Sequence, residues 1–177
     1  MADGILDIDP NETAAEWLRT KTWTNARGRD DRDRDRAGMD VAAGDGREHA
    51  VVLDRDTGAV LGESAGDGHS VTPDWNAAIG RDVCVYHNHP NWDPTLSPDD
   101  VLAALRGNVH ELGAVTPVDS MRLVAREKNA RLADRVREFK RRFDSASGYE
   151  RLAIADEWRK ALKAWDRTGV FKVVRLK

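Results

Sequence analysis

The sequence predicts an α/β domain, because short apolar runs typical of strands are followed by long segments with the period of a helix. Strand-like runs occupy residues 48–54, 59–63 and 82–86. Beyond residue 130, apolar residues recur every three or four positions, as on a helix that packs along one side. With 177 residues, of which 40% are hydrophobic, the chain suits one domain with a buried core and extensions.

The first 46 residues are expected to lie outside this domain. Residues 11–23 have the pattern of an amphipathic helix, and we assign residues 1–25 to an N-terminal helix. Residues 27–36 alternate arginine and aspartate almost without interruption and contain no apolar residue to bury. We therefore predict a flexible linker over residues 26–46 and a domain over 47–177, with its core in 47–126 and an extension in 127–177.

The domain begins with strands at 48–54 and 59–63, which flank a turn at 56–58. A helical turn near residues 75–79 and a buried strand at 82–86 follow. Ser97-Pro98-Asp99-Asp100 is typical of a helix start, and it precedes an apolar series that extends the predicted helix to Leu112. Two short strands at 113–117 and 120–125 complete the core.

The extension predicts two helices and a strand. Two sets of apolar residues recur at helical spacing on either side of a break at 145–148: Leu132, Val136, Phe139 and Phe143, then Ile154, Trp158, Ala161 and Trp165. We expect a helical hairpin, followed by an alternating strand at 170–176 that returns to the sheet edge. Basic residues surround the first helix between 128 and 142. A solvated face is the default interpretation, and a surface for nucleic acid or an acidic partner is the alternative.

Residues 87–100 contain two histidines, a serine and an aspartate with the spacing H-x-H-x7-S-x2-D. Residues two apart at the end of a strand face the same side, so His87 and His89 are able to reach one ion. Asp100 falls in the first turn of the next helix. Zinc binds imidazole nitrogen and carboxylate oxygen, and catalytic sites typically use three protein ligands and leave a fourth position to water. We therefore predict that His87, His89 and Asp100 bind one zinc ion.

This segment, including Pro90 after the second histidine, resembles the motif of the JAMM (MPN+, or JAB domain) metalloproteases. Its nearest likeness is to RadC-like and to phage-, plasmid- and toxin-associated JAB domains. The resemblance covers about residues 46–126 and implies a mixed sheet flanked by helices, similar to cytidine deaminases, to which the C-terminal hairpin is added. It implies that the histidines and Asp100 hold zinc, that Ser97 helps to hold the polarised carbonyl oxygen, and that an upstream glutamate is the general acid/base.

Two glutamates precede the motif close to strands, Glu48 and Glu63. Members of the family carry their glutamate at the start of the first strand, which selects Glu48 and leaves Glu63 as the weaker candidate. The chemistry needs a carboxylate within hydrogen-bond reach of the attacking water. Ser97 has two open roles, because an N-cap serine before proline and acidic residues is also an ordinary helix start.

The resemblance implies zinc-dependent hydrolysis of peptide or isopeptide bonds in a protein or peptide substrate, with ubiquitin-like and phage- or plasmid-related proteins both open. The alternatives are a non-proteolytic scaffold that binds proteins and a RadC-like DNA-associated factor. The net charge of −3 gives no overall attraction to nucleic acid or anionic membranes. No apolar run approaches the roughly 20 residues of a membrane helix, and no signal peptide is evident, so we expect a cytoplasmic protein.

Overall fold

The computed structural model describes residue 18 and residues 47–89, 93–116, 120–126 and 128–176. The predicted linker over 26–46 lies outside the described residues, as does the predicted helix over 1–25 apart from Leu18, which is helical and buried. Within the described part, the chain is of the mixed α/β class, with six strands in one sheet and three helices.

The sheet has the strand order β2-β1-β3-β4-β5-β6. The strands are, in chain order, β1 (His49–Asp54), β2 (Val60–Ala65), β3 (Val83–Asn88), β4 (Val109–Val115), β5 (Ser120–Ala125) and β6 (Phe171–Leu176). Only β3 and β4 pair in parallel, and every other neighbouring pair is antiparallel. All six residues of β3 are buried, as expected for a central strand covered on both faces.

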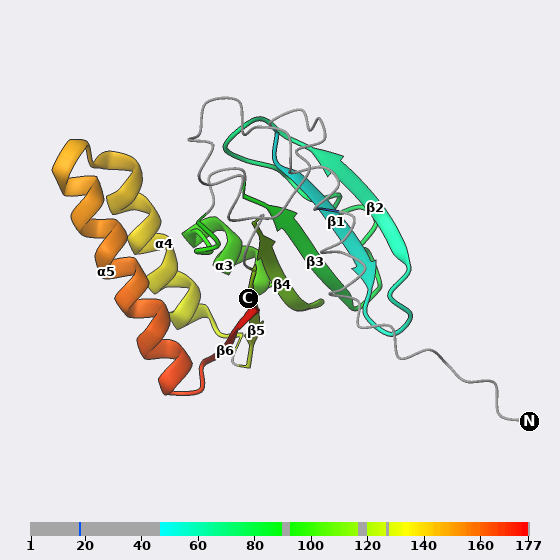
Figure 1. The fold of residues 1–177 in the computed structure, drawn as a ribbon. Coiled ribbons are helices and arrows are strands. Elements are labelled where there is room, and N and C mark those ends of the chain that lie inside the picture. Colours follow the sequence, from blue (N-terminus) through cyan, green and yellow to red (C-terminus); the bar gives the residue numbers. More distant parts are fainter. Residues whose placement is uncertain (1–17, 19–46, 90–92, 117–119, 127, 177) are drawn as a thin grey trace, which may run out of the picture.

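The helices α3 (Pro98–Ala104), α4 (Ala130–Ser145) and α5 (Gly148–Arg167) cover one face of the sheet (Figure 1). On this face, Val85 and Leu112 of the sheet share the main hydrophobic core with Val101 of α3 and Trp158 of α5. A smaller cluster lies on the opposite face, where Leu18 packs with five residues of the sheet: Val51, Leu53, Cys84, Tyr86 and Val115.

The predicted helix after Ser97 is wrong at its C-terminal end. Helix α3 ends at Ala104, and Val109 and Leu112 belong to β4 instead. Residues 107 and 108 are Gly-Asn, a turn signal that interrupts the helix. The Asn108 side chain fixes the turn by donating to the carbonyl oxygens of Ala78 at 2.8 Å and Arg81 at 3.2 Å. Branched residues at 109 and 112 fit a helical period and a buried strand equally well, so the apolar pattern alone was ambiguous.

The predicted C-terminal hairpin and returning strand are confirmed as elements. Asn129 caps α4 by accepting a hydrogen bond from the Leu132 backbone N–H at 2.8 Å. The two helices pack through edge-to-face aromatic contacts, including Phe139 with Trp158 at a centroid distance of 5.2 Å. Strand β6 then pairs antiparallel with β5 and forms an edge of the sheet.

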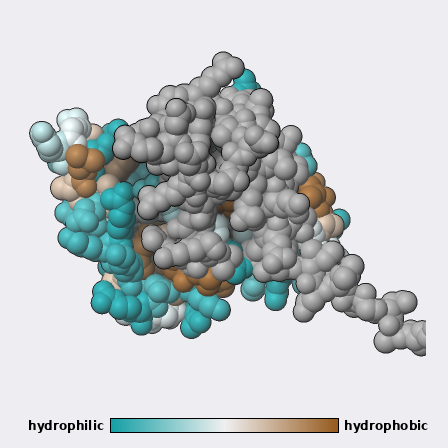
Figure 2. All heavy atoms as spheres, in the orientation of Figure 1, coloured by the Kyte–Doolittle hydropathy of each residue, from teal (hydrophilic) through white to brown (hydrophobic). Residues whose placement is uncertain are grey.

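Hydrophilic residues predominate on the side of the molecule where the hairpin lies, with small apolar patches among them (Figure 2). No helix in the described residues combines the length and the apolar character needed to cross a bilayer.

Candidate metal centre

The end of β3 brings two imidazoles together. His87 lies in the strand and His89 follows it directly, and both side chains are buried. Because the two residues are two apart, their rings meet on one side, with the two Nε2 atoms 2.8 Å from each other. The predicted convergence of the two histidines is therefore present.

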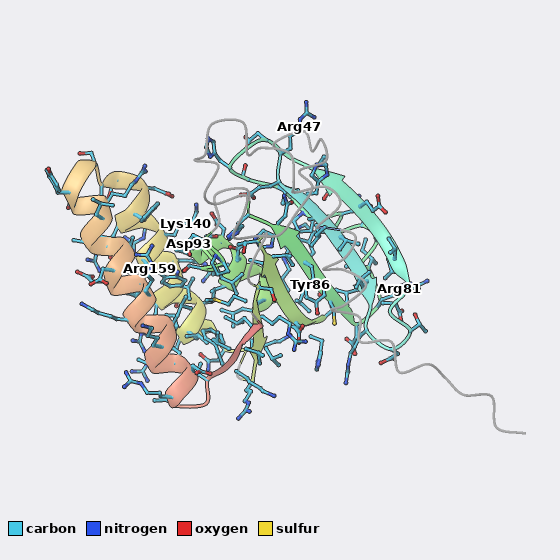
Figure 3. All side chains as sticks on the ribbon, in the orientation of Figure 1. Arg47, Arg81, Tyr86, Asp93, Lys140 and Arg159 are labelled. Atoms are coloured by element: carbon cyan, nitrogen blue, oxygen red, sulfur yellow. The ribbon has the colours of Figure 1, made fainter. Side chains whose placement is uncertain are left out.

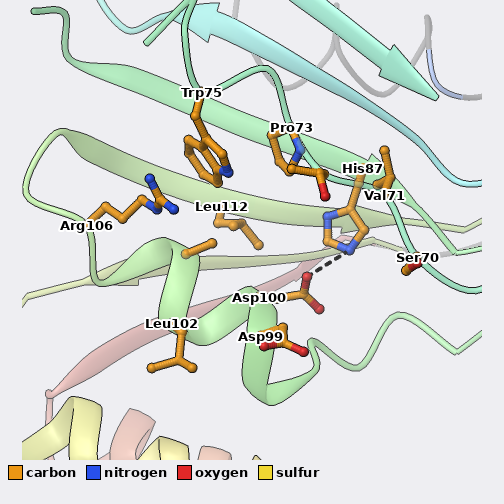
Figure 4. A pocket seen from close by; sticks show the side chains of 12 residues that line it. Ser70, Val71, Pro73, Trp75, His87, Asp99, Asp100, Leu102, Arg106 and Leu112 are labelled. Atoms are coloured by element: carbon orange, nitrogen blue, oxygen red, sulfur yellow. Dashed lines mark ion pairs between the residues drawn. The ribbon is translucent and has the colours of Figure 1, made fainter. Parts of the chain in front are cut away.

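Asp100 reaches the same point from the first turn of α3. Its Oδ1 lies 3.3 Å from His87 Nε2 (Figure 4). One ligand atom from each of His87, His89 and Asp100 lies within 4.8 Å of the other two. Two imidazole nitrogens and one carboxylate oxygen, brought together by a strand end and a helix start, form a donor set that suits zinc.

Backbone contacts orient the two rings. His89 Nδ1 lies 2.6 Å from the Asp93 carbonyl oxygen, which requires Nδ1 to carry the proton and leaves Nε2 as an acceptor. The His87 ring forms a hydrogen bond with the Gly113 backbone on β4. Partners of this kind fix the tautomer and direction of metal-ligating histidines.

Ser97 caps α3 and holds the Asp100 carboxylate. Its Oγ accepts a hydrogen bond from the Asp100 backbone N–H at 3.2 Å and donates one to Asp100 Oδ2 at 2.7 Å. The Ser97 backbone N–H also donates to Oδ2 at 2.6 Å, which completes a capping box. Since Oδ2 is held in this way, Oδ1 is the oxygen that faces His87. The helix-start role of Ser97 is thus observed, and its contact with a substrate carbonyl stays a prediction.

Glu48 lies beside the ligands, immediately before β1. Its backbone N–H donates to the Asp67 carbonyl at 2.6 Å, and its carbonyl accepts from the Gly66 N–H at 2.8 Å. Ala50 pairs with His87 across the β1–β3 ladder, and Glu48, two residues earlier in extended chain, faces the same side. Burial leaves Glu48 8% exposed.

Burial raises the Glu48 pKa to about 7, and the Asp100 carboxylate contributes in the same direction although His87 opposes it. A carboxyl group that is poised near neutrality beside a ligand cluster suits proton transfer in both directions.

Glu63 lies on the other face of the sheet. It pairs with Val51, whose side chain belongs to the smaller cluster away from the helices, and it is exposed to solvent. Paired residues in a ladder share a face, so the β1–β2 register keeps Glu63 away from His87. Of the two predicted candidates, the sheet brings only Glu48 to the ligands.

The three ligand residues influence each other's protonation. Burial alone would lower the pKa of His87, but the charge and hydrogen bond of Asp100 outweigh it and raise that pKa. Burial, together with the charge of His87, lowers the pKa of His89. Burial opposes ionisation of Asp100, yet His87 and His89 hold its pKa well below the usual range. Without a metal ion, these shifts favour a protonated His87 beside an ionised Asp100.

Asn88, between the histidines, has a role that the sequence did not reveal. Its side chain is fully buried, where it donates to the Arg47 carbonyl oxygen at 3.1 Å and accepts from the His49 backbone N–H. Asn88 therefore connects the end of β3 to the residues on both sides of Glu48. The sequence held one signal for this role. Asn88 is a polar amide at the end of a strand that is buried on both faces, where such a side chain needs hydrogen-bond partners.

The helical hairpin also holds the segment between the histidines and Asp100, which was not predicted. Arg159 of α5 bonds to the Asp93 carboxylate at 3.1 Å, and Trp158 Nε1 donates to the Leu96 carbonyl oxygen at 2.8 Å. Lys140 of α4 binds the Asp99 carboxylate at 2.8 Å. Figure 3 shows Asp93, Lys140 and Arg159 gathered where the hairpin meets the sheet domain.

A cavity of about 390 Å³ opens from His87 and Asp100. It extends between the segment before β3 and the exposed side of α3 (Figure 4). Its volume lies in the range of ligand-binding pockets. The cluster is thus adjacent to a cavity of ligand-binding size.

Comparisons with protein families, curated proteins and solved structures gave no match for this chain.

Proposed function

We propose that this protein is a zinc-dependent hydrolase of peptide or isopeptide bonds that uses a JAMM-type mechanism. The observation that carries the proposal is the convergence of His87, His89 and Asp100 beside the buried carboxyl group of Glu48. A structural zinc site typically has four protein ligands and no open coordination position. Three protein ligands next to a cavity and a proton-transfer group are typical of a catalytic site.

His87 and His89 would hold the ion through Nε2, and Asp100 through Oδ1. Bound zinc would supply Lewis acidity, which polarises the scissile carbonyl and makes water a better nucleophile at neutral pH. Glu48 would accept a proton from the attacking water and later donate it to the departing amine. Its pKa near 7 lets the same carboxyl group perform both transfers.

Ser97 and the hairpin would position these groups. The Ser97 hydroxyl and backbone N–H hold Asp100 Oδ2, which directs Oδ1 to the ion. To stabilise the substrate oxyanion, the Ser97 hydroxyl would turn its single proton from Asp100 Oδ2 to the substrate, while the Ser97 backbone N–H continues to hold Oδ2.

The arrangement of the elements supports the JAMM-type assignment of the fold. A central strand delivers both histidines, the following helix start delivers Asp100, and the chain just before β1 delivers the glutamate. This is the distribution that the motif resemblance implies. The substrate in the proposal is a protein or peptide, with ubiquitin-like tails as one class to test.

The proposal is tested by metal analysis combined with a cleavage screen. Purified protein is loaded with zinc and incubated with a proteome-derived peptide library and with lysine-linked diubiquitin, and new termini are mapped by mass spectrometry. We expect one zinc per chain and cleavage by wild type, loss of cleavage with zinc retained in Glu48→Gln, and full activity in Glu63→Gln. Undiminished cleavage by Glu48→Gln would remove that residue from the mechanism, and stoichiometric zinc without any cleavage would favour a metal-binding scaffold.

A further inference from the structure

Apolar and polar side chains both line the cavity beside the metal ligands. Val71 and Pro73 line one side, and Leu102 of α3 and Leu112 of β4 line another (Figure 4). Trp75 and Arg106 stand at the end opposite His87. The cavity thus links the ligand cluster to an aromatic and cationic end through a passage of mixed apolar and polar lining.

Arg106 is held in place at that end by stacking. Its guanidinium carbon lies 4.0 Å from the centroid of the Trp75 ring, a cation–π arrangement that fixes the direction of the side chain. No carboxylate among the described residues forms an ion pair with Arg106. Of the two carboxylates on the cavity wall, Asp100 lies at the ligand end, and Asp99 is neutralised by Lys140 at 2.8 Å. The far end therefore presents an oriented cation that no carboxylate of the described residues neutralises.

The spacing between the two ends is set by α3. Arg106 follows Asp100 by six residues along the helix and its last turn. At a rise of about 1.5 Å per residue, the two backbone positions are about 9 Å apart. An extended peptide advances about 3.3 Å per residue, so a substrate that runs parallel to α3 would pass from the level of Asp100 to that of Arg106 in about three residues.

We propose that the cavity is a substrate subsite that recognises an acidic residue about three positions from the scissile bond, through a salt bridge to Arg106. The proposal rests on the hydrolase function above and names the substrate class for it. The carboxylates of Asp99 and Asp100 on the cavity wall disfavour a polyanion such as nucleic acid, and the apolar side chains among the lining residues suit a peptide segment. The planar guanidinium suits two parallel hydrogen bonds to one carboxylate.

Binding measurements test the subsite separately from cleavage. The zinc-loaded Glu48→Gln protein is titrated into two pools of labelled random-sequence decapeptides, identical except for Glu or Gln at one central position. Fluorescence polarisation reports affinity. We expect about three- to tenfold tighter binding of the Glu pool, the range for a partly exposed charged pair.

Variants added to the Glu48→Gln background assign the preference to Arg106. Arg106→Gln should abolish the difference between the pools without weakening the Gln pool, and Arg106→Lys should retain part of it. Arg131→Gln, which removes an exposed arginine of α4, should keep the full difference. Equal binding of the two pools, or a preference that survives Arg106→Gln, would overturn the subsite. Tighter binding of a single-stranded oligonucleotide of equal charge that depends on Arg106 would overturn the assignment to peptides.

The two proposals fail in different ways. If wild type cleaves nothing but the Glu preference depends on Arg106, the subsite stands and the hydrolase function does not. If cleavage occurs, mapped sites should show acidic residues enriched about three positions from the cut bond, and Arg106→Gln should remove this enrichment. Cleavage with no such enrichment refutes the subsite alone.

Discussion

Ionised Glu48 should destabilise the metal-free protein, so replacing it by glutamine should stabilise the fold above neutral pH. Burial raises the pKa of this carboxyl group from its ordinary value of 4.5 to about 7 in the folded chain. When folding raises the pKa of a carboxyl group, its contribution to the stability of the fold is fully present below pH 4.5. This contribution is lost as the pH rises through about 7. Glutamine does not titrate, so the free energies of unfolding of wild type and Glu48→Gln should diverge between pH 4.5 and about 7.

The size of the effect follows from the two pKa values. A tenfold change in proton affinity corresponds to about 1.4 kcal/mol, so a change from 4.5 to about 7 corresponds to about 3 kcal/mol. We therefore expect Glu48→Gln to gain about 3 kcal/mol over wild type between pH 4.5 and pH 8, while it loses activity. Gain of stability with loss of function is typical of a residue whose environment is arranged for catalysis.

The assay is urea unfolding in the presence of EDTA at several pH values from 4.5 to 8. Titrating groups that do not interact with Glu48 are common to both proteins and cancel in the difference, whereas its interactions with His87 and Asp100 are part of the pKa of Glu48. Glu63→Gln is the matched control, because Glu63 is exposed on the opposite face, and its stability should follow wild type. In saturating zinc the advantage of Glu48→Gln should shrink, because a nearby cation favours the ionised carboxylate. A Glu48→Gln protein that is less stable than wild type at pH 8, or a difference that does not change with pH, would refute the reasoning.

Three further predictions concern the ligands and their supports. Ser97→Ala should lower the free energy of unfolding in urea by about 1 kcal/mol, because the helix cap is lost. It should also weaken zinc binding about tenfold or more, because the hydroxyl no longer holds Asp100. Unchanged zinc affinity would contradict this. Trp158→Phe should cost about 1–3 kcal/mol, because the Leu96 carbonyl oxygen loses its donor, and a melting curve identical to wild type would contradict it. Zinc affinity, measured by competition with a chelating dye, should rise with pH, with a midpoint above 6.5, because binding requires neutral His87 and the pKa of His87 is raised. An affinity that does not change between pH 5.5 and 8 would count against His87 as a ligand.

The ligand cluster was predictable because its determinants are local. A strand places residues two apart on one side, and Ser97-Pro98 marks a helix start three residues before Asp100. These two features decide the positions of all three ligands. The mixed α/β class followed from the same kind of local pattern.

The features that were not predicted depend on contacts between distant segments. The end of α3 was misplaced because branched residues at 109 and 112 suit both a helix and a buried strand. The preference for Glu48 over Glu63 came from the family resemblance, because the residues alone do not give the ladder register that decides which glutamate faces His87. The contacts of Trp158 and Arg159 with the metal-site loop join residues more than 60 positions apart, a separation that periodicity does not address.

The central claim is that His87, His89 and Asp100 bind one zinc ion. X-ray absorption spectroscopy at the zinc edge of the stoichiometrically loaded protein tests it most directly. The account predicts a shell of nitrogen and oxygen ligands at about 2.0–2.1 Å, with outer-shell scattering from two imidazoles that falls to one in His89→Ala. A spectrum without imidazole scattering, with sulfur ligation from Cys84, or unchanged by His89→Ala would contradict the claim.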